Sequence, residues 1–238
     1  MGDVGKRAVT VSSFFCLVFC MASSVLADGM VPETTVIILE EEDGEASINV
    51  KNSDAAAALL YSSIEDIPED LEPFLFVTPP ITRLDPGEKQ LVRFISQLKE
   101  PLKTQRLKRV AFEGLPEKKS ADTETVGVTI RQNLPLIMHP KGLARNHQPW
   151  TLLKWSQGGG HLRIQNDSPY VVRMAQDVLL LPQKRLVDIG RTYVLPGETL
   201  SKKIDAALEG TTSVRINPAT VYGFTVASHD ASVVVETP

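Results

Sequence analysis

The chain has 238 residues, of which 42% are hydrophobic and 23% are charged, and its formal net charge at pH 7 is −4. This composition is ordinary for a globular protein and is sufficient for one or two domains that bury real cores. The acidic balance argues against a nucleic-acid partner, because nucleic-acid binding needs a basic surface.

The first 27 residues are predicted to be a secretory signal peptide. Lys6 and Arg7 precede an apolar run, and Val25-Leu26-Ala27 supplies small residues where signal peptidase cuts. The run is too short for a typical membrane span, and no later stretch approaches the roughly 18 to 20 apolar residues that a span requires. We therefore expect a mature chain that starts at Asp28 and is not embedded in a membrane.

Both cysteines, Cys16 and Cys20, lie inside this predicted signal peptide. Cys20 follows an apolar run, as a lipoprotein cysteine does, but Phe19 stands where a lipoprotein signal needs a small residue. The mature chain is expected to have neither disulfides nor thiol chemistry and to be held together by packing alone. Since the leader carries two basic residues and one acidic residue, the mature chain keeps 23 basic and 28 acidic residues, a net charge of −5.

The mature chain then shows one predicted strand after another. Short segments that are rich in β-branched residues, or that alternate between apolar and polar residues, predict strands at 36–39, 46–52, 59–64, 74–78, 90–95 and 108–113. The acidic run 40–44 between the first two segments predicts a hairpin turn. Strands of this length and spacing are typical of a β-sandwich.

A seventh strand is predicted at 125–136, where Val126, Val128 and Ile130 alternate with small or polar residues. A polar run precedes this segment and predicts a loop. Pro135 lacks a backbone donor and is tolerated in sheets mainly at edges, strand starts or bulges, which favours an edge strand. An open edge with exposed apolar side chains invites another chain to add a strand, so a stable secreted protein keeps one only if it is covered or used.

A pattern of one alternating strand that ends in asparagine, followed later by a proline–glycine turn, occurs twice. The interval is 34 residues from Asn52 to Pro86 and 30 residues from Asn166 to Pro196. The repeat indicates two β-sandwich domains of similar layout in tandem. The predicted limits are 1–27 for the signal peptide, 28–140 for the N-terminal domain, 141–148 for the linker and 149–238 for the C-terminal domain.

Several motifs carry a family resemblance across the mature chain. The most specific is Val77-Thr78-Pro79-Pro80-Ile81-Thr82-Arg83-Leu84-Asp85-Pro86-Gly87-Glu88, and the supporting segments are 112–116, 136–140 and 166–172. With them the chain resembles a periplasmic chaperone of the bacterial chaperone/usher pathway, which folds pilus or fimbrial subunits and delivers them to an outer-membrane usher. The resemblance implies a periplasmic all-β protein with two tandem immunoglobulin-like β-sandwich domains, arranged as a boomerang with a cleft between them.

The resemblance also implies how the protein binds a subunit. A pilus subunit of this pathway lacks its own last strand, and the chaperone fills the gap with the last strand of its N-terminal domain, here about 125–136. Counted back from the proline that ends the motif, the inserted residues are Val126, Val128 and Ile130. The residues alone leave open that these three side chains pack the protein's own core. An open edge also gives the free protein a route to self-association.

The chain departs from the commonest branch of the family, which holds the terminal carboxylate of the subunit with an arginine and a lysine. The matching positions here are Thr35 or Val36 and Pro135, which carry no charge. The candidate replacements are Arg131, Lys108 and Arg109, each of which is also read as a solvated surface charge. We therefore expect a divergent branch of the family.

No catalytic, metal or cofactor site is predicted. The four histidines have no metal-ligand spacing, the chain has no G-x-S-x-G motif, and Gly158-Gly159-Gly160 predicts a hairpin turn instead of a phosphate loop. A structural or adhesive pilus component with two β-sandwich domains is the alternative. It is disfavoured because 28–34 is short for a donor segment and the mature chain lacks a cysteine pair. A secreted carbohydrate-binding module or hydrolase is disfavoured by the low aromatic content, 6%.

Overall fold

The computed structural model describes residues 29–116, 129–205, 210–220 and 226–236. In these ranges the protein is all-β, and its one helical segment is the short 3-10 turn η1 (Pro149–Leu152). No helix in the described ranges is long and apolar enough to cross a membrane. The predicted signal peptide lies outside the described residues.

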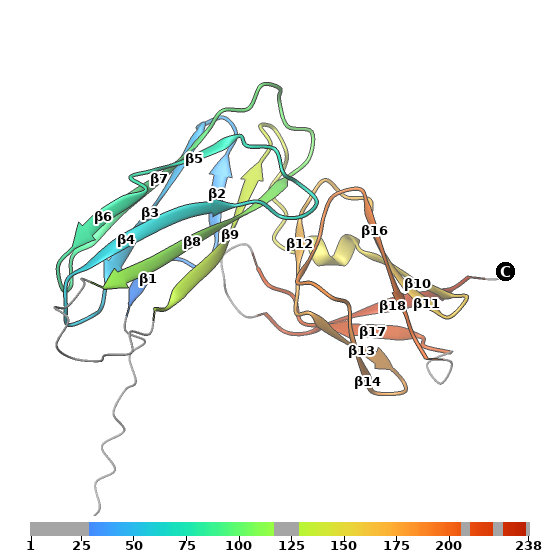
Figure 1. Cartoon of the computed structure of the whole chain (residues 1–238). Coiled ribbons are helices and arrows are strands. Elements are labelled where there is room, and N and C mark those ends of the chain that lie inside the picture. The colour runs from blue at the N-terminus through green and yellow to red at the C-terminus, as the bar shows by residue number, and fades with distance from the viewer. Residues whose placement is uncertain (1–28, 117–128, 206–209, 221–225, 237–238) are drawn as a thin grey trace, which may run out of the picture.

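The N-terminal domain is a sandwich of two sheets, and its strands carry the cooler colours of Figure 1. The four-stranded sheet has the order β1 (Met30–Pro32), β3 (Glu45–Asn52), β7 (Lys89–Ser96), β5 (Leu75–Thr78). The five-stranded sheet has the order β2 (Ile37–Glu40), β9 (Arg131–His139), β8 (Arg106–Pro116), β4 (Ala58–Glu65), β6 (Ile81–Leu84).

The core of this domain comes from the alternation that predicts its strands. Val92 and Phe94 of β7 and Val110 and Phe112 of β8 are all fully buried, because alternate residues of both sheets point inward. The rings of Phe94 and Phe112 meet edge to face, with centroids 6.3 Å apart. Six of the seven predicted strands therefore form close to where the pattern indicates.

Three expectations need correction. The run 40–44 is not a hairpin turn, because β2 belongs to the five-stranded sheet and β3 to the four-stranded sheet, so the turn crosses from one layer to the other. The strands β1 and β6 were not predicted, because β1 has three residues and β6 buries only Leu84. The last strand, predicted at 125–136, is β9 at Arg131–His139, and residues 117–128 lie outside the described residues.

The C-terminal domain contains η1 and the remaining strands. Its seven-stranded sheet has the order β14 (Arg185–Asp188), β13 (Asp177–Leu181), β17 (Ser213–Ile216), β18 (His229–Val235), β10 (Lys154–Gly158), β11 (His161–Asn166), β16 (Glu198–Lys203). A two-stranded sheet pairs β12 (Val172–Arg173) with β15 (Tyr193–Val194). Gly159 and Gly160 have φ values of 58° and 72° and join β10 to β11, which confirms the predicted glycine hairpin.

The two domains repeat one local device. The side chain of Asn52 donates hydrogen bonds to the carbonyl oxygens of Ala56 and Leu84, and that of Asn166 donates to the carbonyl oxygen of Tyr170 in the equivalent place. Both asparagines are fully buried. Each one ties the end of its strand to the loops around it, which explains why the asparagine recurs in the sequence.

The domains meet at an angle (Figure 1), and residues of β8 and β9 from one domain and of β15 from the other, Leu107, Ile137 and Tyr193, lie in their contact. An apolar cluster fills the contact: Val36, Ile67, Leu107, Ile137 and Val171 are buried, and Ile38, Tyr193 and Leu195 pack against them. A hollow of about 370 Å³ lies beside this cluster and is lined by residues of both domains, including Glu69, Arg106 and Pro196. The predicted tandem β-sandwich architecture is thus confirmed, whereas the predicted domain limits stay a prediction.

Candidate functional site

The strand β9 is open along half of its outer edge. Its inner edge pairs with β8 along all but the last residue, from Arg131 opposite Glu113 to Met138 opposite Arg106. On the outer edge, β2 pairs with β9 in parallel, but only from Leu136 onward. No strand among the described residues pairs with the outer edge of residues 131–135. Within the predicted segment 125–136, the edge-strand prediction is therefore right for 131–135 and wrong for Leu136, while 125–128 lie outside the described residues.

Alternate residues of β9 point to opposite faces of the sheet. Leu134, Leu136 and Met138 point into the core. Ile130 has the same parity but lies just before β9, beside Gly29, and is 41% exposed. Ile130 thus presents an apolar side chain at the open end of the sandwich. Of the three predicted donor residues it is the one that the structure describes, since Val126 and Val128 lie outside the described residues.

The outer face of the same strand carries a polar network. Arg131 forms an ion pair with Glu65 of β4, and the Asn133 amide donates to Glu65 at 2.5 Å. Arg109 of β8 lies over β9, where its Nε donates to the Asn133 side-chain oxygen at 2.6 Å and its Nη2 to the Asn133 carbonyl oxygen at 2.9 Å. Arg131 therefore has a carboxylate partner, whereas Arg109 donates to uncharged oxygens.

Lys108 is not the surface charge that the sequence suggested. It has the core-facing parity of β8, and its side chain is 1% exposed. Its ammonium donates to Asp66 Oδ1 at 2.6 Å, to the Asp70 carbonyl oxygen at 2.6 Å and to Asp70 Oδ1 at 3.2 Å, and it lies 4.9 Å from the Phe74 ring centroid. Because these contacts use all three donors, Lys108 stabilises the end of the sandwich and offers nothing to a partner.

The structure adds a residue that the sequence did not single out. Arg173 belongs to β12 in the C-terminal domain, and it donates to the Thr220 carbonyl oxygen at 3.4 Å. Burial first, and then the positive charge of Arg109, lowers the pKa of Arg173 to about 10. Burial likewise lowers the pKa of Arg109. A signal for Arg173 exists in the sequence, because it is the single charge within the apolar run 170–175.

A buried hydrogen-bonded link joins the two domains at Gln105. Its backbone N–H donates to the Pro169 carbonyl oxygen, and its side-chain oxygen accepts from the Val171 N–H, both at 2.8 Å. Its amide nitrogen lies 2.9 Å from His139 Nδ1, and His139 Nε2 lies 2.9 Å from the Leu143 carbonyl oxygen. Since a carbonyl only accepts, Nε2 carries the proton of the neutral ring and Nδ1 accepts from Gln105.

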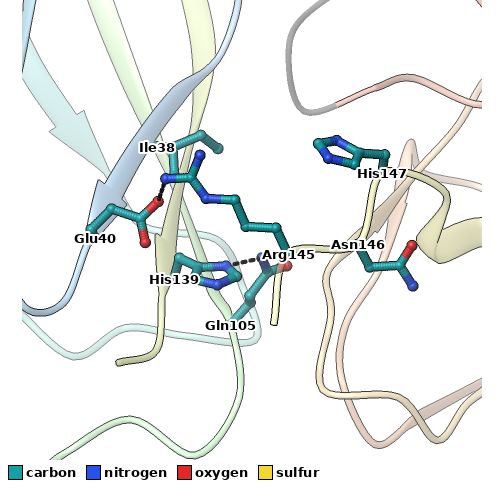
Figure 2. A pocket seen from close by; sticks show the side chains of 7 residues that line it. All are labelled: Ile38, Glu40, Gln105, His139, Arg145, Asn146 and His147. Carbon is teal, nitrogen blue, oxygen red and sulfur yellow. Dashed lines mark hydrogen bonds and ion pairs between the residues drawn. The ribbon is translucent and has the colours of Figure 1, made fainter. Parts of the chain in front are cut away.

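Figure 2 shows the small pocket beside this link, with a volume of about 100 Å³. The side chain of Arg145 extends across it from the segment between the domains and forms an ion pair with Glu40 of β2 at 2.8 Å. The pocket therefore lies within the contacts that hold that segment against the N-terminal domain. Among the described residues there is no cluster of side chains that would bind a metal ion.

A second feature of the N-terminal domain is an apolar patch on the outer face of the five-stranded sheet. Leu59 and Tyr61 of β4 and Ile81 of β6 are 41%, 37% and 54% exposed, and Tyr61 pairs directly with Ile81. β4 and β6 lie on the far side of β8 from β9. The patch is thus separate from the open edge.

Two family models cover the chain. The model described as "Pili and flagellar-assembly chaperone, PapD N-terminal domain" matches residues 29–144, and that described as "Pili assembly chaperone PapD, C-terminal domain" matches residues 148–229. The fimbrial chaperone YhcA of Escherichia coli is 40% identical over 211 residues, which cover 88% of this chain and 93% of that protein. The chaperone FimB/FhaD of Bordetella pertussis is 27% identical over 201 residues, which cover 71% and 75%.

Solved structures of chaperones share the fold. The SafA pilin–SafB chaperone complex of Salmonella enterica matches with a TM-score of 0.71 at 18% identity, over 88% of this chain and 98% of that chain. The CupB2 chaperone of Pseudomonas aeruginosa matches with a TM-score of 0.67 at 23% identity, over 85% and 100%. The two domain matches and the 40% identical relative in Escherichia coli identify the chain as a member of the PapD family of pilus-assembly chaperones.

Proposed function

We propose that this protein is a periplasmic chaperone that binds and folds pilus or fimbrial subunits by lending them a β-strand from about 125–136, and that it delivers them to an outer-membrane usher. The observation that carries the proposal is the open outer edge of residues 131–135 with the exposed Ile130 at its start. A subunit strand that pairs with this edge gains main-chain hydrogen bonds and covers apolar side chains in one step.

The parity of the strand supports the choice of donor residues. Because side chains alternate, a strand that continues upstream from β9 in the complex places Val126, Val128 and Ile130 on the face of Leu134. Each apolar side chain that becomes buried against the subunit contributes on the order of 1.5 to 3 kcal/mol. The exposure of Ile130 favours donation over the alternative that it packs the domain's own core.

The test is a double substitution, Val128→Ser with Ile130→Ser, in the chaperone co-produced with a pilus subunit. We expect the subunit to be lost from pull-downs, with binding weaker by several kcal/mol, while the melting temperature of the free chaperone changes little. The matched control is Leu91→Ser on β7, which is 46% exposed on the other sheet and should leave subunit binding intact. A large loss of stability in the free double variant would show that these residues belong to the domain's own core and would contradict the donor-strand assignment.

Delivery to the usher needs a second surface that stays accessible while β9 is occupied. The patch of Leu59, Tyr61 and Ile81 supports this part of the proposal, because exposed apolar patches on soluble proteins mark interaction sites. We expect Ile81→Asp to keep subunit binding and to abolish pili on the cell surface, counted by electron microscopy. Normal piliation of the Ile81→Asp strain would remove the patch from the proposal. The control Leu186→Asp changes an exposed leucine of β14 in the other domain.

A further inference from the structure

The start of β9 has little attachment to the core of its own domain. The inward positions there are Ile130, which is 41% exposed, and Gln132, which is polar, so the first buried apolar side chain of the strand is Leu134. The outer edge of 131–135 has no paired strand within the described part of the chain. Residues 131–133 are therefore held by their backbone pairing with β8 and by the contacts of their outward side chains.

The outward side chains of this segment meet one carboxylate. Glu65, the last residue of β4, forms an ion pair with Arg131 and accepts a hydrogen bond from the Asn133 amide at 2.5 Å. Because β8 lies between β4 and β9, the Glu65 side chain reaches across a whole strand. The register partner of Asn133 on β8 is Ala111, whose one-carbon side chain leaves room for this contact. Ala111 has outward parity and is nevertheless 1% exposed, which indicates that the polar side chains cover it.

Glu65 is itself fixed by contacts that do not involve β9. On one side of it, Ile64 packs against the core of the domain. On the other side, Asp66 accepts a hydrogen bond from the buried ammonium of Lys108 at 2.6 Å. Arg109, the register partner of Glu65, adds to its hold on β9 with two hydrogen bonds of 2.6 and 2.9 Å to that strand. The carboxylate is thus presented to β9 from a rigid part of the sandwich.

The location of this contact matters more than its strength. An ion pair between partly exposed groups contributes little to the stability of a whole domain. The end of an open edge strand, however, opens locally at a much smaller free-energy cost than the domain unfolds, so the same contact decides whether that segment is ordered. A segment that becomes ordered only on binding weakens the complex by the cost of ordering it.

We propose that Glu65 is a positioning residue for strand donation. It holds residues 131–133 extended from the outer face of the sheet, and it leaves the inner face with Ile130 and the unpaired edge to the subunit. Arg131 is then the residue through which Glu65 acts on the strand. This proposal rests on the proposed function, because it assigns Glu65 a role in binding a subunit along that edge.

The first experiment needs no subunit and measures hydrogen exchange of the free chaperone by mass spectrometry. It compares the wild type with Glu65→Leu and with the control Glu45→Leu, which removes a partly exposed glutamate that pairs with Arg93 in the other sheet. We expect the backbone amides of 131–134 to exchange several-fold faster in Glu65→Leu and at the wild-type rate in the control. The melting temperatures of all three proteins should agree within a few degrees. Unchanged exchange at 131–134, or loss of the fold in Glu65→Leu, would overturn the proposal.

A double-mutant cycle with Arg131→Leu separates positioning from a general structural role. Because Glu65 is proposed to act through Arg131, Glu65→Leu should accelerate exchange and weaken subunit binding less in the Arg131→Leu background than in the wild type. Fully additive effects would show that Glu65 acts elsewhere in the protein and would contradict the assignment.

The second experiment titrates a pilus subunit with each chaperone. We expect Glu65→Leu to weaken subunit binding on the order of tenfold and Glu45→Leu to leave it unchanged. In the complex, the amides of 131–134 should be equally protected in the wild type and in Glu65→Leu, because the added strand then pairs with the edge. Equal affinities of the wild type and Glu65→Leu would refute the positioning role while the proposed function stands. If the wild type binds no subunit, the proposed function fails, and the positioning role fails with it.

Discussion

At the scale of single residues, Lys108 shows how strand parity can bury a charge. It shares the inward parity of Val110 and Phe112 on β8, so its side chain enters the end of the sandwich. The loop between β4 and β5 supplies Asp66 and Asp70 to meet it. Lys108 and Arg109 are neighbouring charges in the sequence. Successive side chains of a strand point to opposite faces of the sheet, so only Arg109 faces the outer surface.

This arrangement predicts the effect of removing Lys108. Lys108→Met should lower the free energy of unfolding by about 3 kcal/mol, because it leaves the partly buried Asp70 with one cationic partner fewer. The matched change Lys154→Met breaks the exposed pair with Asp167 and should cost less than about 1 kcal/mol. Urea unfolding of both variants measures the difference, and equal losses would contradict the structural role of Lys108.

At the scale of elements, the strands with a clear period were predictable and the others were not. The alternation at 46–52 and 90–95 locates β3 and β7 because one face of each is buried. Periodicity says nothing about which sheet a strand joins, and this is why the turn at 40–44 was misread as a hairpin.

The candidate site was predictable in part for the same reason. Pro135 correctly indicated an open edge, because a missing backbone donor is tolerated where no strand pairs. The contacts of Gln105 with Pro169 and Val171 could not be predicted from the sequence, because they depend on how two separate domains meet. The roles of Val126 and Val128 stay a prediction.

At the scale of the whole molecule, the domain contact predicts a coupled unfolding reaction. Gln105 links the domains through Pro169 and Val171, next to the buried apolar cluster of the junction. Gln105→Ala leaves the buried Val171 N–H without its acceptor, which costs roughly 1 to 3 kcal/mol. Scanning calorimetry should then show the single transition of the wild type separate into two.

The control for this prediction is Gln176→Ala, since the side chain of Gln176 bonds the exposed Asp188 within one domain. Its calorimetric trace should match the wild type. A single unchanged transition in the Gln105 variant would mean that the apolar cluster alone couples the domains.

The packed junction has a consequence for the speed and strength of subunit capture. Two domains on a free linker would have to be brought into one arrangement each time a subunit arrives, and the lost conformational entropy would weaken every complex. Here the contacts of Gln105 and the junction cluster fix the C-terminal domain and the open edge of β9 relative to each other during folding of the chaperone itself. Under the proposed function, a subunit that arrives partly folded meets a template that is already ordered, and only the subunit becomes ordered on binding.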